Sequence, residues 1–335
     1  MDIGTIKEYY KKGLDYFNQM QFISTWKQAE DFKKGKQWPK ATEKTKNMPR
    51  PVINIIRYIE NYKVSQILSE PISMIFSPRD AEYSQDDTSL VGAEIFTKHS
   101  EEEWENVKQD DLNEEALDRA SDIGSGIYHY YYDDSVISGL NTIVKGQLKG
   151  EILHPINVFV GNPQSLDTQS QPYILITVRD DVKAIRDRAK ANGTSVEDLS
   201  KIKGDKDTAN EGSNNSNFEI NDKATEITCY WKENGTAWLM KICGDVVTKE
   251  PVDTGHTLYP IARMNWYKDD KNWYGYGDTT DLIPNQKSIN FITAMRMMAE
   301  QYGGMPKLML KKGMIDNFSN DPSVPIVDNS SVGWS

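Results

Sequence analysis

Apolar side chains recur at helical spacing near the start of the sequence. Over residues 1–35 they follow a period close to 3.6 residues, which predicts one amphipathic helix ending at Lys33-Lys34-Gly35. A second helix is expected after the extended run Val52-Ile53-Asn54-Ile55-Ile56. It continues to Leu68, because Pro71 stops it.

The central part of the chain carries polar helices. Residues 86–125 predict two acidic helices that break near Asp110-Asp111. Residues 182–191 predict a short helix, with Asp180-Asp181 as its cap and Gly193 behind its last turn.

The last helix has the clearest pattern. Thr279 or Thr280 is the expected cap, and Gly303-Gly304 is expected to end the helix. Its apolar positions predict one broad apolar face: Leu282, Ile283, Ile289, Ile292, Met295, Met298 and Met305. Residues 307–310 after it fit either a strand or a further helix.

Strand patterns lie between the helices. The predicted strands are 72–78, 127–132, 141–144, 150–160, 173–178, 225–231, 236–242 and a last one leading to 259–264. Asn234-Gly235 joins two of them and is the strongest short signal for a hairpin. Residues 203–222 are polar and rich in Asn, Gly and Ser, which is typical of a disordered loop. Helices and strands together indicate the α+β class.

Composition narrows the protein class. The chain has 335 residues, 38% of them hydrophobic, and a formal net charge of −11. The low apolar content indicates either a chain that buries less of itself than usual or one that completes its burial against partners. No apolar run reaches the roughly 20 residues of a membrane span, and the N-terminus lacks the pattern of a signal peptide. Two cysteines, Cys229 and Cys243, fit a reducing compartment better than a disulfide framework.

The charge is unevenly distributed. Residues 81–125 carry 14 acids and 3 bases, a local net of −11. This segment is either a solvated helix face or an acidic surface that meets a basic partner or repels nucleic acid. Residues 278–312 carry five bases and three acids, a net of +2.

The sequence offers no local catalytic or metal-binding constellation. The four histidines lie far from each other and from the cysteines, so no zinc ligand set is expected. No phosphate-binding loop, dinucleotide fingerprint or nucleophile elbow occurs. The glycines of Gly275-Tyr276-Gly277 predict a tight turn before the last helix. Acidic pairs such as Asp86-Asp87, Asp110-Asp111 and Asp180-Asp181 are interpreted as caps and solvated faces, not as nuclease carboxylates.

Four segments occur in an order that resembles the portal proteins (head-to-tail connectors) of tailed bacteriophages. They are Gly35-Lys36-Gln37-Trp38-Pro39 after the first helix, Arg50-Pro51-Val52-Ile53-Asn54-Ile55-Ile56, Ile152–Pro163, and Gly275-Tyr276-Gly277-Asp278 with Leu282–Asn290. The third segment is similar to a family pattern that ends in Asp-Pro, and here Gly161-Asn162 stands where Asp is common. The resemblance covers roughly residues 26–310.

The resemblance implies an α+β portal fold with a helical wing and stem and a small β-rich clip, assembled as a ring. Residues 1–178 would form the first part of the wing, 179–202 the first stem helix and 203–272 the clip. Residues 273–304 would form the second stem helix. Residues 305–335 would return toward the wing through the tunnel loop, with the crown absent or truncated.

The resemblance also implies a role without enzymatic activity or cofactors. A dodecameric ring at one capsid vertex would conduct double-stranded DNA during packaging and ejection, without sequence specificity. Its partners would be the terminase, the head–tail adaptor and tail proteins, and the major capsid and scaffolding proteins, with no membrane. The protein would reside in the virion, and in the host cytoplasm during assembly.

Candidate site residues follow from these assignments. The residues expected to line the DNA channel are Lys287, Arg296, Lys307, Lys311 and Lys312, unless these are ordinary solvent-exposed side chains. The residues expected to dock the terminase and adaptor are Trp231, Asn234 and Trp238. Two other functions stay open: a metal-dependent nuclease or other phage nucleic-acid enzyme, and a phage adaptor or scaffold protein without a channel.

Overall fold

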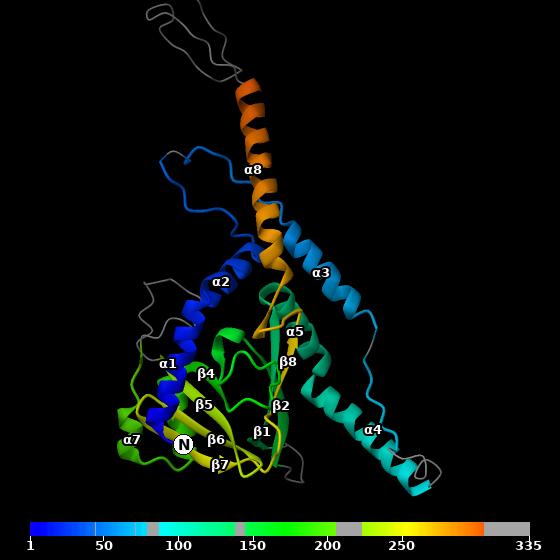
Figure 1. Ribbon diagram of the computed structural model, residues 1–335, viewed down its shortest axis with the longest axis vertical. Coiled ribbons are helices and arrows are strands. Elements are labelled where there is room, and N and C mark those ends of the chain that lie inside the picture. The colour runs from blue at the N-terminus through cyan, green and yellow to red at the C-terminus, as the bar shows by residue number, and fades with distance from the viewer. Residues whose placement is uncertain (44, 71, 79–86, 138–144, 206–222, 305–335) are drawn as a thin grey trace, which may run out of the picture. The chain divides into compact units, whose positions relative to one another are not determined.

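The computed structural model describes the chain from 1 to 335 except residues 44, 71, 79–86, 138–144, 206–222 and 305–335 (Figure 1). It mixes helix and sheet, with 46% of residues helical and 26% in strands. The expected α+β class is therefore confirmed at this coarse level.

Eight α-helices and ten strands are formed by the described residues. The helices are α1 (Ile3–Gln19), α2 (Phe22–Lys33), α3 (Ile55–Ile67), α4 (Asp87–Val107), α5 (Gln109–Ile123), α6 (Val182–Ala191), α7 (Val196–Lys201) and α8 (Asp278–Gly304). The strands are β1 (Ser125–Ile137), β2 (Lys145–Leu153), β3 (Val158–Val160), β4 (Tyr173–Asp181), β5 (Lys223–Glu233), β6 (Thr236–Cys243), β7 (Val246–Asp253), β8 (Ile261–Asn265), β9 (Tyr267–Asp269) and β10 (Asn272–Tyr276).

The chain divides into two compact units. The first, here called the body, comprises Met1–Lys34 and Ile55–Ile283. The second, here called the α8 module, comprises Gly35–Asn54 and the chain from Pro284 onward. The division falls inside α8, at a proline that lacks the N–H for one helical hydrogen bond.

Two antiparallel sheets form the frame of the body (Figure 1). One has five strands in the order β3-β4-β5-β6-β7, and the other has three in the order β2-β1-β8. Helix α1 covers one face of the five-stranded sheet. There the ring of Tyr9 stacks on that of Tyr173, with 3.9 Å between the ring centroids. The rings of Phe17 and Phe159 stack with 4.8 Å between their centroids. Adjacent strand residues point to opposite faces, so Tyr230 of β5 lies on the other face. There its hydroxyl bonds to His129 Nε2 of β1 at 2.9 Å and links the two sheets.

The helix predictions are largely confirmed. The helix expected over 182–191 is α6, and the break expected in the acidic helices is present, with Lys108 left-handed at φ 55°. The single helix expected over 1–35 is wrong, because Gln21 is also left-handed (φ 56°) and divides α1 from α2. This break lets Phe17, Phe22 and Trp26 pack together around Tyr274.

The strand predictions are confirmed for the hairpin and wrong at residues 72–78. Asn234 and Gly235 have φ values of 54° and 87°, as a two-residue hairpin turn with left-handed backbone requires, and they connect β5 to β6. Residues 72–78 pair with no strand in the described structure and expose their apolar side chains, with Ile75 81% exposed. Strands β7, β9 and β10 were not expected, because charged or small residues interrupt their apolar patterns. The expected strand at 141–144 and the pattern at 307–310 lie outside the described residues.

The expected segment boundaries at 178, 202 and 272 do not separate compact bodies in the described structure. Strand β4, expected in the wing, pairs along its whole length with β5, expected in the clip. Helix α6, expected as a stem helix, packs Val182, Ile185 and Ala189 into a small core with strand residues of the same sheet. Wing, stem and clip therefore remain names for sequence segments here, not for separate domains.

The glycines before α8 serve close packing. The turn predicted at Gly275-Tyr276-Gly277 is wrong: Gly275 belongs to β10, and neither glycine has a positive φ. A Cβ on Gly275 would lie 2.6 Å from the carbonyl oxygen of Gly124, and one on Gly277 would lie 2.5 Å from that of Ser121. The backbone before α8 can approach the end of α5 only because these side chains are absent.

We predict that Gly277→Ala lowers the free energy of unfolding by about 1–3 kcal/mol, because the added methyl group meets rigid backbone. Gly92→Ala is the matched control. A Cβ at Gly92 has no atom within 4 Å, and alanine favours the α4 helix by up to about 1 kcal/mol. Urea unfolding of both variants measures the difference. Equal effects of the two changes would contradict the close-packing role.

Candidate functional site

Buried polar side chains gather at the start of α8, within the body. Asp278, the first residue of α8, accepts hydrogen bonds from Trp266 Nε1 at 2.9 Å and from the Tyr267 hydroxyl at 3.0 Å. Lys63 of α3 donates to the same carboxylate at 2.7 Å, and this bond raises the pKa of the Lys63 ammonium. A carboxylate in the first turn also stabilises the positive end of the helix dipole.

Thr279, the next residue, connects α8 to two other helices. Its buried hydroxyl hydrogen-bonds to Glu60 Oε1 of α3 and, at 2.9 Å, to Asp122 Oδ1 of α5. Lys33, at the end of α2, lies 3.2 Å from Glu60 Oε2 and donates to Asp118 Oδ1 at 2.8 Å. We call Lys33, Glu60, Asp118, Asp122 and Thr279 the root cluster. Its members belong to four helices that are far apart in the sequence.

Burial dominates the electrostatics of the root cluster. Loss of solvent raises the pKa of Asp122 to about 7 and also raises the pKa of Glu60. Burial alone would lower the pKa of Lys33, but the charges of Glu60 and Asp118 outweigh it and raise that pKa. Lys33 therefore stays charged at neutral pH, whereas Asp122 is close to its titration midpoint.

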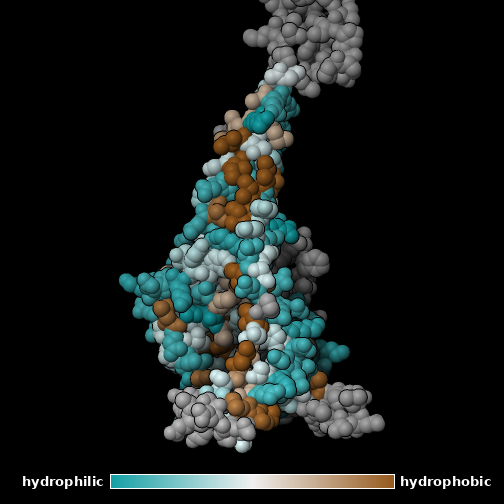
Figure 2. All heavy atoms as spheres, turned by 90° about the vertical axis from the view of Figure 1, so that its right-hand side faces the viewer, coloured by the Kyte–Doolittle hydropathy of each residue, from teal (hydrophilic) through white to brown (hydrophobic). Residues whose placement is uncertain are grey.

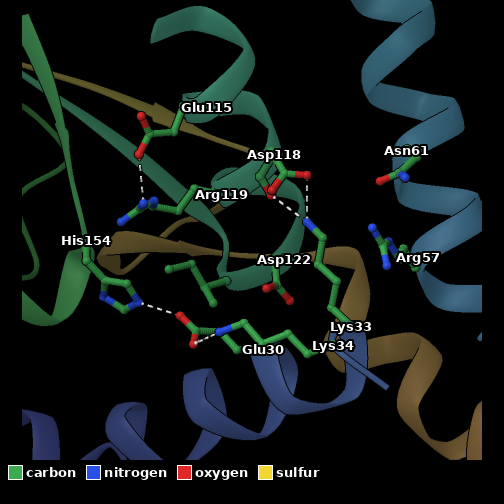
Figure 3. A pocket seen from close by; sticks show the side chains of 11 residues that line it. Glu30, Lys33, Lys34, Arg57, Asn61, Glu115, Asp118, Arg119, Asp122 and His154 are labelled. Carbon is green, nitrogen blue, oxygen red and sulfur yellow. Dashed lines mark hydrogen bonds and ion pairs between the residues drawn. The ribbon is translucent and has the colours of Figure 1, made fainter. Parts of the chain in front are cut away.

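A cavity of about 480 Å³ opens beside the root cluster (Figure 3). Lys33, Asp118 and Asp122 line it together with charged residues that pair among themselves. Lys34 and His154 both bond to Glu30, at 2.9 and 2.8 Å, and Arg119 bonds to Glu115 at 2.9 Å. The bond from His154, foremost among several contributions, lowers the pKa of Glu30 to about 2. The positive and negative charges that line the cavity compensate one another. We therefore interpret the cavity as a route for solvent to Asp122 and not as a ligand site.

The α8 module contains a second polar cluster, formed by uncharged amides. Asn290 Nδ2 donates to Gln37 Oε1 at 2.6 Å, and Gln37 Nε2 donates to Asn54 Oδ1 at 3.2 Å. Gln286 Nε2 donates both to Asn290 Oδ1 at 2.9 Å and to the carbonyl of Ile53 at 2.6 Å. We call Gln37, Asn54, Gln286 and Asn290 the amide cluster. It holds residues 35–54 against the middle of α8.

The side of α8 next to this buried face carries exposed apolar residues (Figure 2). Phe291, Met295, Met298 and Tyr302 follow one another at steps of four, three and four, so they share one side of the helix. Phe291, Ile292, Met295 and Tyr302 are 49–65% exposed. The single apolar face expected for this helix is therefore wrong: the buried face carries Gln286, Asn290 and Ala294, and most apolar side chains face solvent.

The residues expected to line a DNA channel are only partly described. Lys287 and Arg296 are exposed on α8, and Arg296 bonds to Glu300 at 2.9 Å. Lys307, Lys311 and Lys312 lie outside the described residues. A channel role for these side chains stays a prediction.

The residues expected to dock partners lie on the β5–β6 hairpin. Trp231 is buried (7% exposed) and stacks on the half-buried Trp238 at 6.2 Å. Asn234 is exposed at the turn. The buried indole N–H of Trp238 has no acceptor among the described residues. Trp231 thus belongs to the core, and the docking role of the hairpin stays a prediction.

The closest approach to a catalytic arrangement is a chain of three side chains between the sheets. The Tyr230 hydroxyl bonds to His129 Nε2, and His129 Nδ1 bonds to Glu151 at 2.8 Å. Tyr230 is buried, and burial raises its pKa well above the ordinary value, so its hydroxyl is a poor nucleophile. Its described role is to join the sheets.

The acidic pairs Asp110-Asp111 and Asp180-Asp181 do not converge on a common site, and Asp86 of the third pair lies outside the described residues. Asp110 accepts from Trp104 Nε1 at 2.9 Å, and Asp180 pairs with Arg188 at 2.6 Å. Within the described ranges, no group of three or more His, Cys, Asp or Glu side chains could hold a metal ion. None of the helices that the described residues form is long and apolar enough to cross a membrane.

Sequence reasoning missed both polar clusters. Glu60, Asp122 and Thr279 lie far apart in the sequence and look like ordinary surface or capping residues. A signal was available for the amide cluster, because Gln286 and Asn290 are four residues apart and continue the spacing of the buried Ile283. Their partners Gln37 and Asn54 belong to two of the segments that carry the portal resemblance.

Comparison of the chain with protein-family models gives no match, and comparison with curated proteins gives none either.

We predict that Asn290→Ala loosens residues 35–54 from α8, because it leaves the buried amides of Gln37 and Gln286 without partners. The expected cost is about 1–3 kcal/mol. Asn285→Ala changes an exposed residue of the same helix and is the matched control. Hydrogen exchange of peptides spanning 35–43 and 284–294 should accelerate only in Asn290→Ala. Unchanged exchange in both variants would show that the amide cluster is not required.

Proposed function

We propose that this protein is a subunit of a phage portal, a ring that conducts double-stranded DNA at one capsid vertex. One observation carries the proposal. Three of the four segments that resemble the portal family meet in the amide cluster, through Gln37, Ile53 with Asn54, and Gln286 with Asn290. Segments that are distant in the sequence but join in one buried cluster have a shared structural purpose, which supports their use as a family signature.

Exposed apolar surface supports assembly from several copies. Besides the apolar side of α8, the body itself exposes two apolar patches: residues 72–76 and the first half of α4, where Leu90, Val91, Ile95 and Phe96 are exposed. Large contiguous apolar surface is unusual on a soluble monomer and marks contact sites. Burying such faces against neighbouring subunits would also account for the low apolar content of the chain.

The charge distribution suits a conduit for DNA. Each basic contact to a phosphate strengthens binding and its dependence on salt, so a channel that lets DNA pass needs few of them. In the proposal Lys287 and Arg296 of α8 supply these contacts, and ring symmetry repeats them around the bore. The neighbouring Glu300 weakens the pull of Arg296 on DNA.

The remaining surfaces are assigned within the same proposal. The hairpin around Asn234 would meet the terminase and later the head–tail adaptor. The acidic helices α4 and α5 would face basic partners or repel DNA in the wing of the ring. Capsid and scaffolding proteins would contact the ring during assembly in the host cytoplasm, before it becomes part of the virion.

Electron microscopy of the purified protein tests the proposal. Negatively stained particles should be rings with a central hole and roughly twelvefold symmetry, as the family resemblance implies. Mass photometry should give a matching mass. A stable monomer, or an assembly without a bore, would refute the portal function and favour an adaptor or scaffold protein.

A pair of glutamate substitutions tests which side of α8 meets its neighbours. Met295→Glu places a charge among the exposed apolar residues, and we expect it to abolish ring formation while the subunit stays folded. Gln301→Glu adds the same charge to an exposed position about 120° around the helix from Met295 and should leave rings intact. Mass photometry separates rings from monomers. Rings in both variants would exclude the apolar side of α8 as the subunit contact.

A further inference from the structure

The hydroxyl of Thr279 lies between two carboxyl groups inside the body. It is within hydrogen-bond distance of Glu60 Oε1 and of Asp122 Oδ1, and all three side chains are buried. A threonine hydroxyl has a single hydrogen to donate, and an ionised carboxylate has none. Two hydrogen bonds at this oxygen therefore require a second hydrogen, and only a protonated carboxyl can supply it.

The charged groups around this hydroxyl also indicate one additional proton. From α2, Lys33 brings one positive charge, and Glu30 of the same helix is engaged by Lys34 and His154. From α5, Asp118 is a negative neighbour, whereas Arg119 is paired with Glu115. From α3 and α8, Lys63 and Asp278 pair with each other, and Arg57 lines the cavity. Lys33 thus faces three carboxyl groups: Glu60, Asp118 and Asp122.

We propose that Glu60, Thr279 and Asp122 hold one proton in common, and that its release loosens the first turn of α8 from α3 and α5. With the proton, Thr279 donates to one carboxylate and accepts from the other carboxyl, and every contact at its oxygen is a hydrogen bond. Without it, one of the two contacts becomes a repulsion between an oxygen lone pair and a buried carboxylate. The cavity beside Asp122 gives the proton a route to solvent. The inference does not rest on the portal function.

The direction of the pH dependence follows from the bound proton. The pKa of Asp122 is raised to about 7 by burial, and that of Glu60 is raised as well. Below the ordinary aspartate pKa of about 4 both the folded and the unfolded state hold the proton, and the contribution to stability is complete. Between about pH 4 and 7 only the folded state holds it, so this contribution is lost as the pH rises through about 7.

Hydrogen exchange of the full-length protein between pH 5 and 8 tests the proposal. The wild type is compared at each pH with Asp122→Asn and with Glu60→Gln, whose amides can donate the missing hydrogen without titrating. Exchange in residues 276–283 of the wild type, relative to either variant, should increase by up to about tenfold per pH unit and level off above about pH 7. Comparison at equal pH cancels the intrinsic pH dependence of exchange. A ratio that stays constant with pH for both variants would overturn the proposal.

Glu115→Gln provides the control, because Glu115 lines the same cavity but does not contact Thr279. This variant should keep the wild-type dependence on pH; loss of that dependence would assign it to the cavity charges and overturn the shared proton. Infrared spectroscopy of the wild type supplies a measurement that needs no folded variant. A carboxylic-acid carbonyl band should be present at pH 6 and absent at pH 8. Its absence at pH 6 would also overturn the proposal.

Discussion

The approach of Gly277 to the end of α5 is the contact on which the arrangement of the body around α8 depends. The strand before α8 lies against the carbonyl groups of Ser121 and Asp122, where no side chain fits. From this position Thr279 reaches both Glu60 and Asp122, and Lys33 also contacts Glu60. The arrangement of α2, α3 and α5 around the start of α8 therefore depends on two features. They are the missing side chain at Gly277 and the hydrogen bonds of Thr279.

The start and the middle of α8 are positioned by buried polar groups, while most of its apolar side chains are exposed. An apolar contact tolerates small shifts of register, whereas a buried amide or carboxyl group that loses its partner costs about 1–3 kcal/mol. Gln286 and Asn290 therefore select one position of residues 35–54 along the helix, as Thr279 selects one position of α3 and α5. The apolar residues near Met295 are left free for contacts that the single chain does not make.

Local patterns in the sequence predicted most helices and strands well, but they predicted poorly which of these elements contact one another. The helix at 182–191 and the Asn234-Gly235 hairpin depend on neighbouring residues, and both are present. The root cluster depends on contacts between residues separated by up to 219 positions, so Glu60 and Asp122 looked like surface acids. For α8 the sequence predicted one apolar face, but the buried side of the helix carries Gln286 and Asn290, because a sequence pattern does not say which partner covers a helix face.

The two polar clusters differ in how they respond to their surroundings. The amide cluster contains only Gln and Asn side chains, which do not titrate, so its hydrogen bonds are the same at every physiological pH. The root cluster contains three carboxyl groups and one ammonium, and one of its carboxyl groups has a pKa of about 7. Since Pro284 already interrupts the hydrogen bonding of α8 between the clusters, a change of protonation acts on the first turn of the helix and leaves the attachment of residues 35–54 intact. A pH response of this protein would therefore begin at Thr279.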